Sequence, residues 1–457
     1  MEQPATRNPR DAHSRCAIAA RRDRRRATAR AFEPQRGVVG RRTRREVRRV
    51  KLLSAPKGWS QILMTPPATP WSALRAALAA GGASTAQTLI EAGLRGRGGG
   101  GFLTGEKWRT TASSEADRRY AVANAYESDP AVFANRLLLE KNALGVIEGL
   151  AIAALSVGAR ESLIGIRAEY SDAIRALEAV IASAERDGIL GASVLGSGRE
   201  LLIRVVPLQG SSMIGEETVL LKALAGKRGQ PEQTPPYPST VGYLGKPTAV
   251  NNVATLAAVP WILAHGAAAF KQIGDPTEPG TVLVQVGGAV ANAGVLEVPT
   301  GTPLAEIVAV AGGSAKGTAI KALLVGGSSG GFIPAQLLAS TPYSGAGLAA
   351  VGAHIGSGAL LALDGSVSIP ELAAMLTRWC ADEACGKTIP CRIGTRRLAE
   401  IGQRFVDGLA GPADGERLQA LAADVADSAL CAHERLTPSP LLTGMRYFKQ
   451  EFYPTSV

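Results

Sequence analysis

Short apolar segments typical of strands alternate with longer apolar stretches typical of helices between residues 119 and 224. The strand-like segments lie at 119–124, 162–168 and 201–206. The helix-like stretches follow them, at 137–157, 172–184 and 215–224. A shorter helix is predicted upstream, because Ser84 and Gln87 have capping-box spacing and Gly93 marks a helix end. The β-α-β-α-β-α order predicts a parallel, Rossmann-like α/β sheet with ligands at the carboxyl ends of its strands.

The pattern changes near Thr281, where short strands replace the long helices. Strands are predicted at 281–286, 295–298 and 320–325, with a short helix at 303–311, which is a β-grasp-like order. Four helices are predicted further on, at 369–379, 391–409, 415–429 and 440–452, with a break at Gly411-Pro-Ala-Asp414. We therefore expect a basic tail at 1–63, a Rossmann-like domain at 64–270, a β-grasp domain at 271–360 and a helical bundle at 361–457.

Positive charge is concentrated at the amino terminus. Residues 1–60 hold 18 Lys and Arg against 5 Asp and Glu, whereas the rest of the chain holds 32 against 34. The basic segment has no apolar periodicity, so we expect it to be disordered. It could bind nucleic acid or anionic lipid, it could be a transit peptide, or it could be an upstream extension before a true start at Met64. We favour the extension, and the near-neutral body gives no reason to expect nucleic acid as a partner.

Hydropathy and cysteine placement limit the class of protein. The longest apolar run, 253–270, contains Pro260 and His265, so no membrane span is predicted and we expect a cytoplasmic protein. Four of the five cysteines fall in the last 80 residues: Cys380, Cys385, Cys391 and Cys431. A secreted disulfide-bonded protein would spread its cysteines along the chain, so this clustering predicts a metal site.

A glycine-rich run follows the first predicted helix: Gly93-Leu-Arg-Gly-Arg-Gly-Gly-Gly-Gly-Phe-Leu-Thr-Gly-Glu-Lys-Trp108. Glycine lets successive backbone N–H groups turn toward an anion without Cβ clashes. Arg95, Arg97 and Lys107 add positive charge, and a plain linker would not interleave such cations with aromatic residues. The run predicts a phosphate cradle for a nucleotide or for flavin mononucleotide (FMN).

This run resembles the flavin loop of the FMN- and NADH-binding 51 kDa subunit of respiratory complex I, whose family includes subunits of NAD-linked hydrogenases and formate dehydrogenases. Further segments agree in the same order: Asn124-Ala-Tyr-Glu-Ser-Asp-Pro130, Gly215-Glu-Glu-Thr218, Gly245-Lys-Pro-Thr-Ala-Val-Asn-Asn-Val253 and Cys385-Gly-Lys-Thr-Ile-Pro-Cys-Arg392. The resemblance spans roughly residues 70–452. It implies FMN and NAD as cofactors of the 64–270 domain and an iron–sulfur cluster in the bundle. The β-grasp region resembles the family's soluble-ligand-binding β-grasp (SLBB) module, here expected to be a spacer.

The resemblance also implies individual cofactor contacts. Those to FMN would come from Gly96, Arg97, Gly98, Gly99, Lys107, Asn124, Glu127, Gly215, Val250, Asn251 and Asn252. Those to NADH would come from Phe102, Asp129, Glu216, Glu217 and Tyr237, with the two adjacent glutamates also disfavouring the extra phosphate of NADP. Simpler explanations exist: a solvated loop for Glu127 and Asp129, helix capping for Glu216 and Glu217, and a plain turn for Val-Asn-Asn. Trp108 is expected in the core.

Several positions differ from the family pattern. Tyr126 replaces an Asp beside the flavin, and Ser212, Thr234 and Thr110 replace side chains near NADH. The family binds a [4Fe–4S] cluster through Cys-x-x-Cys-x-x-Cys and a distant fourth cysteine. The three metal candidates Cys385, Cys391 and Cys431 match, but Thr388 occupies the second position. Cys380 or His433 could supply the missing ligand; otherwise the site would hold a three-iron cluster or none.

We therefore predict an NADH dehydrogenase: an NADH-oxidising flavoprotein subunit that passes electrons through FMN to an iron–sulfur centre and a ferredoxin-like partner subunit. Because a flavin converts two-electron to one-electron transfer by itself, no catalytic side chain is expected. The alternative is a degenerate flavin-binding or assembly paralogue that no longer oxidises NADH.

Overall fold

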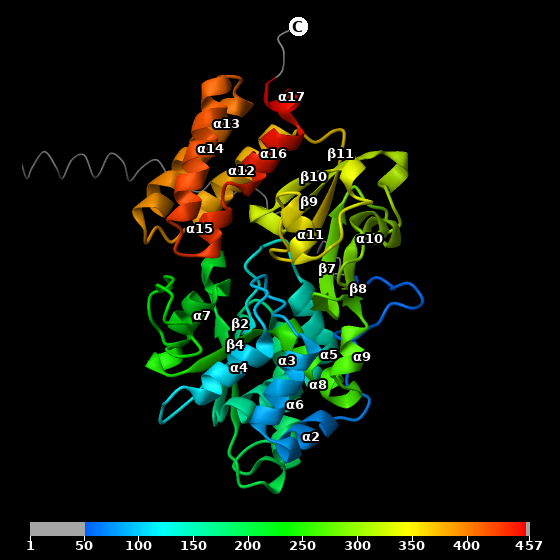
Figure 1. The fold of residues 1–457 in the computed structure, drawn as a ribbon, viewed down its shortest axis with the longest axis vertical. Coiled ribbons are helices and arrows are strands. Elements are labelled where there is room, and N and C mark those ends of the chain that lie inside the picture. Colours follow the sequence, from blue (N-terminus) through cyan, green and yellow to red (C-terminus); the bar gives the residue numbers. More distant parts are fainter. Residues whose placement is uncertain (1–50, 454–457) are drawn as a thin grey trace, which may run out of the picture. The chain divides into compact units, whose positions relative to one another are not determined.

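The computed structural model describes residues 51–453 (Figure 1). Its first sheet has four parallel strands in the order β3-β2-β1-β4. They are β1 (Tyr120–Ala125), β2 (Glu161–Arg167), β3 (Leu202–Leu208) and β4 (Thr248–Asn252). Strand β1 is buried almost throughout, as its run of small apolar residues predicts. The Rossmann-like α/β prediction is confirmed, although β4 was not predicted.

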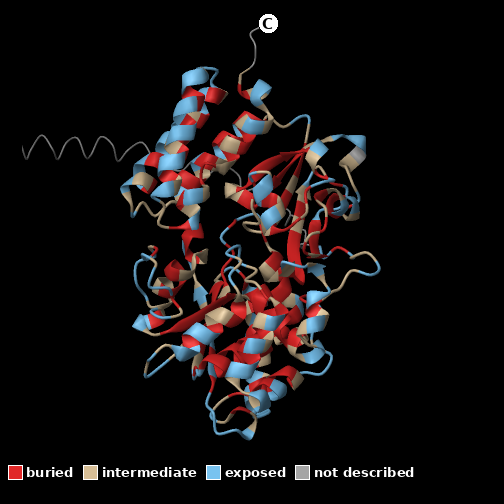
Figure 2. Ribbon diagram, in the orientation of Figure 1, coloured by how far each residue is buried: buried red, intermediate tan, exposed pale blue. Residues whose placement is uncertain are grey.

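Eight helices belong to this domain in the described part of the chain. They are α2 (Ser72–Ala80), α3 (Gly82–Ala92), α4 (Thr104–Ser113), α5 (Ala134–Val157), α6 (Ser171–Arg186), α7 (Glu217–Leu224), α8 (Val253–His265) and α9 (Ala267–Lys271). Figure 2 shows buried residues concentrated in the sheet and the helices that cover it. Helices α5 and α8 are apolar around most of their circumference because both lie inside the domain. Their backbones approach so closely that a Cβ at Gly149 would lie 2.0 Å from the carbonyl oxygen of Leu256.

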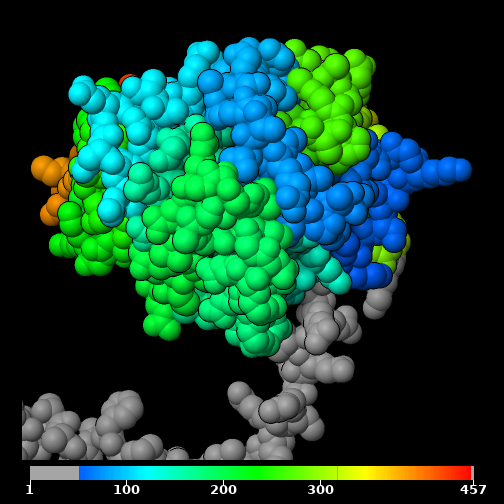
Figure 3. Space-filling view, turned by 90° about the horizontal axis from the view of Figure 1, so that it is seen from below, coloured from blue at the N-terminus to red at the C-terminus, as the bar shows by residue number. Residues whose placement is uncertain are grey.

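The start of α3 differs from the prediction. The helix begins at Gly82, so Ser84 and Gln87 lie inside it and form no capping box. Packing against α5 sets this start, because a Cβ at Gly82 would lie 2.5 Å from the carbonyl oxygen of Ser156. The helix ends as predicted at Gly93, which adopts a left-handed conformation with φ of 68°. Seen from below, the face of the molecule in Figure 3 is formed mainly by this domain, coloured blue to green.

The segment 51–63 is packed rather than part of a disordered tail, which corrects the predicted boundary. Leu53 donates from its amide to the carbonyl of Val295 at 2.8 Å and lies in the core of the second domain. Ile62 and Leu63 lie in the core of the first domain. These apolar residues occur as isolated pairs and leave no periodic signal in the sequence. Residues 1–50 of the predicted tail lie outside the described residues.

The second domain is a five-stranded mixed sheet in the order β10-β9-β11-β7-β8, and it confirms the β-grasp expectation. Its strands are β7 (Thr281–Gly288), β8 (Gly294–Pro299), β9 (Ile320–Val325), β10 (Gly331–Pro334) and β11 (Ala359–Asp364). Strand β11 pairs parallel with β7 and antiparallel with β9. Helices α10 (Leu304–Val310) and α11 (Gly345–Ala350) accompany the sheet, and the ribbon β5 (Gly274–Asp275) and β6 (Glu278–Pro279) precedes it.

The carboxyl-terminal region is helical, as predicted, but its last part is divided. It contains α12 (Ile369–Glu383), a π-helical turn η8 (Pro390–Gly394), α13 (Thr395–Val406), α14 (Pro412–Asp427), α15 (Ala432–Leu436), α16 (Ser439–Tyr447) and α17 (Lys449–Phe452). The predicted helix 440–452 is interrupted at Phe448, whose φ of −128° and ψ of 37° are not helical. Between residues 51 and 453, no helix combines the length and apolarity that crossing a bilayer requires.

Short 3₁₀ turns connect these elements. They are η2 (Val194–Gly196), η3 (Ser212–Gly215), η4 (Tyr243–Gly245), η5 (Ala315–Gly317), η6 (Gly327–Ser329) and η7 (Ala335–Leu337). Turn η3 leads directly into α7. It therefore places the predicted Gly-Glu-Glu-Thr segment at a helix start.

Candidate functional site

The glycine loop lies at the carboxyl edge of the parallel sheet. Asn124 near the end of β1 and Asn252 at the end of β4 are register partners. A Cβ at Gly98 would lie 3.3 Å from the Cβ of Asn252, so the loop passes directly beside this strand end. This is where ligands bind in open parallel α/β sheets.

Backbone hydrogen bonds close the loop and leave its tip open. The amide of Gly96 donates to the carbonyl of Phe102 at 2.9 Å, so this amide closes the loop and is not free for a ligand. Gly98, Gly99 and Gly100 are exposed, and Gly99 adopts the left-handed φ of 91°. A Cβ at Gly100 would meet nothing within 4 Å. The open glycine backbone therefore fits the phosphate cradle predicted for FMN.

The two arginines of the loop form hydrogen bonds to backbone carbonyls of the protein. Arg95 donates from Nη1 to the carbonyl of Gly101 at 3.0 Å. Arg97 donates from Nη2 to the carbonyl of Pro279, and its Nε is buried without a partner. Burial lowers the pKa of Arg97 to about 10. The contact of Arg97 with FMN stays a prediction, for which the unpartnered Nε is available.

Lys107, on α4, is the cation beside the strand ends. Its Nζ lies 3.1 Å from the Glu217 carboxylate and 3.0 Å from the carbonyl oxygen of Val250. Only about a fifth of the Lys107 side chain is exposed, so the ammonium is held in one place. Lys107 thus joins three predicted site segments: the glycine loop, the Gly-Glu-Glu-Thr segment and the Val-Asn-Asn segment.

The Val-Asn-Asn segment is the end of β4 and not a turn, which corrects one alternative. Asn251 accepts a hydrogen bond at 2.8 Å from the indole N–H of Trp108, and Trp108 is fully buried, as predicted. Asn252 caps α8 by accepting from the amide of Ala254 at 2.8 Å. The sequence analysis did not predict this strand, because β4 continues without a break into the apolar helix α8.

The segment after β1 is tied to η3. Asn124 donates from Nδ2 to the carbonyl of Gly215 at 2.8 Å. A Cβ at Gly215 would lie 1.8 Å from the hydroxyl of Ser128, so a larger residue there would require Ser128 to move. Tyr126 is buried, donates to the carbonyl of Gly210 at 2.9 Å and lies under the guanidinium of Arg167. Tyr126 therefore packs into the protein between η3 and β2.

Glu127 and Asp129 are buried, which excludes the solvated-loop alternative for both. Glu127 caps α5 by accepting from the amides of Asn135 at 2.8 Å and Arg136 at 3.2 Å. Burial raises the pKa of Glu127 to about 7. Asp129 accepts from the amide of Ser328 at 2.8 Å, in the second domain. Its carboxylate thus joins two domains, although a ribose contact was predicted.

Glu216 and Glu217 point to different surroundings. Glu216 caps α7 by accepting from the amides of Thr218 and Val219, which confirms the capping explanation for this residue. Glu217 forms the ion pair with Lys107. Burial raises the pKa of Cys431 to about 11, and the nearby Glu216 carboxylate acts in the same direction. Met213 on η3, directly before these glutamates, lies in one buried cluster with Cys431, so this segment connects the FMN cradle to the cysteine region.

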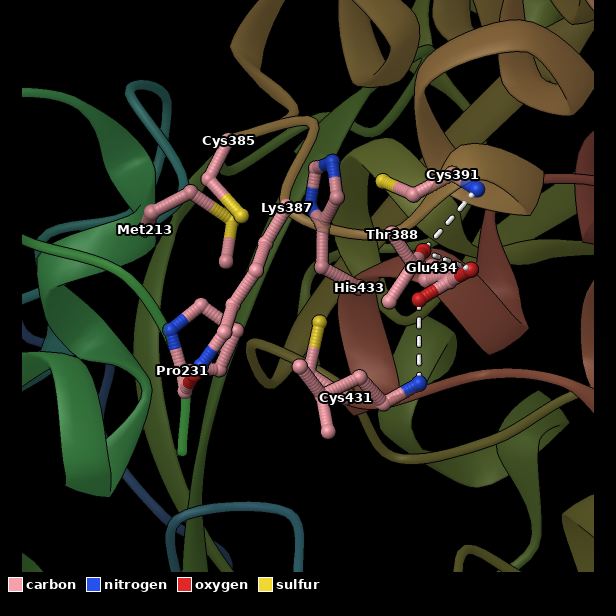
Figure 4. A pocket seen from close by; sticks show the side chains of 10 residues that line it. Met213, Pro231, Cys385, Lys387, Thr388, Cys391, Cys431, His433 and Glu434 are labelled. Atoms are coloured by element: carbon pink, nitrogen blue, oxygen red, sulfur yellow. Dashed lines mark hydrogen bonds between the residues drawn. The ribbon is translucent and has the colours of Figure 1, made fainter. Parts of the chain in front are cut away.

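The three predicted metal-binding cysteines line one pocket. In Figure 4 the sulfur atoms of Cys385, Cys391 and Cys431 point toward its interior. Thr388 and Glu434 also line it, joined by a hydrogen bond of 2.8 Å. Within residues 51–453, no three His, Cys, Asp or Glu side chains converge tightly enough for a single metal ion. A cluster binds each cysteine through a different iron, so separated thiols around one pocket are the arrangement it requires.

Of the two proposed replacement ligands, Cys380 lies elsewhere and His433 lines the pocket. Cys380 is fully buried on α12, and its thiol donates to the carbonyl of Ser328. His433 donates from Nε2 to the carbonyl of Cys380 at 2.7 Å. The sequence analysis missed Glu434, although its position three residues after Cys431 places it at the same site.

Two predicted aromatic contacts are strongly exposed. The side chains of Phe102 and Tyr237 are 59% and 58% exposed. Both rings are therefore available for stacking against a ligand.

Three family models match the chain in the expected order. Residues 89–261 match the Nuo51 FMN-binding domain, 283–333 the SLBB domain and 371–454 the NADH-ubiquinone oxidoreductase-F iron-sulfur binding region. The order of these matches agrees with the three structural regions described above.

Individual relatives cover most of the chain. It is 39% identical over 372 residues to the NADP-reducing hydrogenase subunit HndC of Solidesulfovibrio fructosivorans, covering 81% of this chain and 75% of that protein. It is 36% identical over 365 residues to an NADH-quinone oxidoreductase subunit of Escherichia coli strain K12, covering 79% and 82%. A chain of an NAD⁺-reducing [NiFe]-hydrogenase in the H2-reduced state matches the fold with a TM-score of 0.77 and 29% identity, covering 95% of this chain and 72% of that one. The chain therefore belongs to the family of FMN-binding, iron–sulfur-binding subunits that occur in NADH-quinone oxidoreductases and related hydrogenases.

Proposed function

We propose that this chain oxidises NADH through FMN and passes the electrons to an iron–sulfur cluster in its C-terminal region. The observation that carries this function is the position of the segment from Met213 to Glu217. Glu217 pairs with Lys107 beside the FMN cradle, and Met213 lines the cysteine pocket. One short segment thus contacts both proposed redox sites.

The FMN site uses backbone amides and one cation. Gly98 and Gly99 are exposed residues of the loop whose amides would bind the phosphate, and Lys107 is oriented by Glu217 and by the Val250 carbonyl. Bound FMN supplies the chemistry: it accepts a hydride from NADH and releases electrons singly. The protein's part is to hold the isoalloxazine and nicotinamide rings together, a role that suits the exposed ring of Phe102.

NADH is the expected reductant in this proposal. Glu217 is about one third exposed beside the cradle, and its negative charge would repel the 2′-phosphate of NADPH. Asp129 would not contribute to the preference for NADH over NADPH, because its carboxylate is buried and accepts a hydrogen bond from the amide of Ser328.

The electron acceptor would be a ferredoxin-like iron–sulfur protein that docks beside the cysteine pocket. Ile389 and Ile393 flank Cys391 on the π-helical turn and are 68% and 54% exposed. Apolar side chains exposed this close to a redox site fit a partner surface, where a short distance between clusters is required. We place this activity in the cytoplasm, where the NADH pool would supply it.

Anaerobic reduction tests the proposal. The protein is purified without oxygen, its absorbance spectrum is recorded for flavin and iron–sulfur bands, and NADH is added. Bleaching of the flavin band by NADH supports the proposed function, and slower bleaching by NADPH supports the nucleotide preference. A protein that binds FMN but is not reduced by NADH would be the degenerate flavin-binding or assembly paralogue instead.

A further inference from the structure

Thr388 replaces a thiolate, and its hydroxyl both accepts and donates a hydrogen bond. It accepts a hydrogen bond from the amide of Cys391 at 3.1 Å and donates one to Glu434 at 2.8 Å. A neutral hydroxyl, with a proton that it does not readily lose, is a poor iron ligand compared with a thiolate. What Thr388 does instead is to hold a carboxylate at the corner of the pocket that lacks a cysteine (Figure 4).

Glu434 is a buried carboxylate in the wall of the cysteine pocket, where a charged side chain is unusual. Its side chain is almost completely buried, at 1% exposure, and it lines the same pocket as Cys385, Cys391 and Cys431. Its Oε2 accepts from the amide of Leu430 at 2.9 Å, and its Oε1 accepts from Thr388. A buried carboxylate without an ion pair is costly unless something positive faces it. Among the described residues, no Lys, Arg or His forms a salt bridge with Glu434.

The other side chains around the pocket are worse placed for the corner beside Thr388. Cys380 donates its thiol to the carbonyl of Ser328 and does not line the pocket. His433 lines it and keeps Nδ1 as a possible ligand, because Nε2 donates to the Cys380 carbonyl, but no contact joins it to Thr388. Lys387 carries only donors and bonds to the carbonyl of Pro231. Glu434 is therefore the better candidate, because its carboxylate is an acceptor in contact with Thr388.

We propose that an oxygen of Glu434 is the fourth protein ligand of the cluster, beside the thiolates of Cys385, Cys391 and Cys431. The inference rests on the proposed function, because it requires that a cluster is bound. Thr388 is a positioning residue: its hydroxyl orients Oε1, while the Leu430 amide holds Oε2. Oε1 has a lone pair left after accepting from Thr388, so binding iron breaks neither hydrogen bond. One iron would then have an oxygen ligand, which is harder and exchanges more readily than a thiolate.

Iron content and spectroscopy test this assignment without relying on activity. Wild type, Glu434→Ala and His433→Ala are purified anaerobically, and iron, acid-labile sulfide and FMN are measured per chain. Mössbauer spectra of ⁵⁷Fe-enriched protein report whether one iron differs from the other three. The double variant Thr388→Cys with Glu434→Ala returns a thiolate to the fourth corner. FMN occupancy and the thermal midpoint show whether each variant folds.

The expected wild-type result is about four irons per chain, one of them spectroscopically distinct. Glu434→Ala should drop to about three irons and give the EPR signal of an oxidised three-iron cluster, whereas His433→Ala should keep about four. Thr388→Cys with Glu434→Ala should recover about four equivalent irons. If Glu434→Ala alone does not fold, Glu434→Gln, which keeps the size of the side chain but removes the carboxylate, takes its place in the comparison with His433→Ala.

Different failures have different meanings. Iron loss in His433→Ala with full retention in Glu434→Ala would overturn the assignment and leave the proposed function intact. Four equivalent irons in the wild type would do the same. A wild type with FMN but without iron would overturn the electron route itself, and the Glu434 assignment with it.

Discussion

The Glu297 carboxylate accepts a hydrogen bond of 2.8 Å from the backbone amide of Leu63, a residue 234 positions earlier in the chain. It also accepts from the amides of Ile62 at 2.6 Å and Met64 at 3.0 Å, and from the hydroxyl of Thr281 at 2.6 Å. Glu297 is fully buried on β8, and burial raises its pKa. The amides of the 62–64 segment therefore solvate a carboxylate that water does not reach.

A protein beginning at Met64 should be strongly destabilised compared with one beginning at Lys51. It would lose the burial of Leu53, Ile62 and Leu63, each worth about 1.5–3 kcal/mol, and two of the amide donors to Glu297. Urea unfolding of both proteins would measure the difference in the free energy of unfolding. Equal unfolding midpoints would mean that segment 51–63 contributes nothing to the fold.

Lys107→Ala should lower FMN affinity about tenfold or more, since a charged hydrogen bond is worth about 1.5–3 kcal/mol. Flavin retained after gel filtration and FMN titration of the apoprotein give the measurement. Lys246→Ala is the matched control, because Lys246 pairs with Asp117 on the surface away from the cradle. Unchanged flavin binding in Lys107→Ala would show that Lys107 does not contact the cofactor.

Glu127 should make the fold less stable as the pH rises from about 4.5 to 7. Its pKa is raised from 4.5 to about 7 by burial, so the folded state holds a proton that the unfolded state has released in this window. The stabilisation is complete below pH 4.5 and declines by about 3 kcal/mol up to pH 7. The measurement is the free energy of unfolding of wild type and Glu127→Gln at pH 5 and pH 7.5. Their difference should change between the two pH values, and a constant difference would contradict the raised pKa.

Trp108→Phe should cost about 2–3 kcal/mol of stability, because it leaves the buried Asn251 amide oxygen without its donor and removes packed atoms. It should also weaken FMN binding, since Asn251 neighbours Val250, whose carbonyl orients Lys107. Thermal unfolding with and without added FMN separates the two effects. A variant with wild-type midpoints in both conditions would exclude the structural role of this bond.

Glu217→Gln should narrow the preference for NADH over NADPH, because it removes the negative charge beside the cradle. Asp129→Asn should lower stability and leave the preference unchanged, because Asp129 bonds to protein groups such as the Ser328 amide. Stopped-flow rates of flavin reduction by each nucleotide give the comparison. If Asp129→Asn changes the preference and Glu217→Gln does not, the two roles are reversed.

The sequence by itself determined the classes of structure and the chemistry on offer. Continuous apolar runs, without polar residues at regular intervals, predicted β1 and α5. A segment that is buried on all sides must be apolar on all sides. Glycine density, with Lys107 nearby, predicted a phosphate cradle, since this depends on local backbone freedom. The spacing of Cys385, Cys391 and Cys431 predicted that they meet, and they line one pocket.

Only the tertiary structure decided which groups are free to bind a ligand. Asn124, Glu127 and Asp129 all matched a family motif, yet each makes hydrogen bonds within the protein. The partners of a polar side chain come from distant segments, and no local pattern encodes their distance. For the same reason the sequence could not show that Glu434 lies against Thr388, 46 positions away. A buried carboxylate is recognised only once the surrounding protein has excluded water from it.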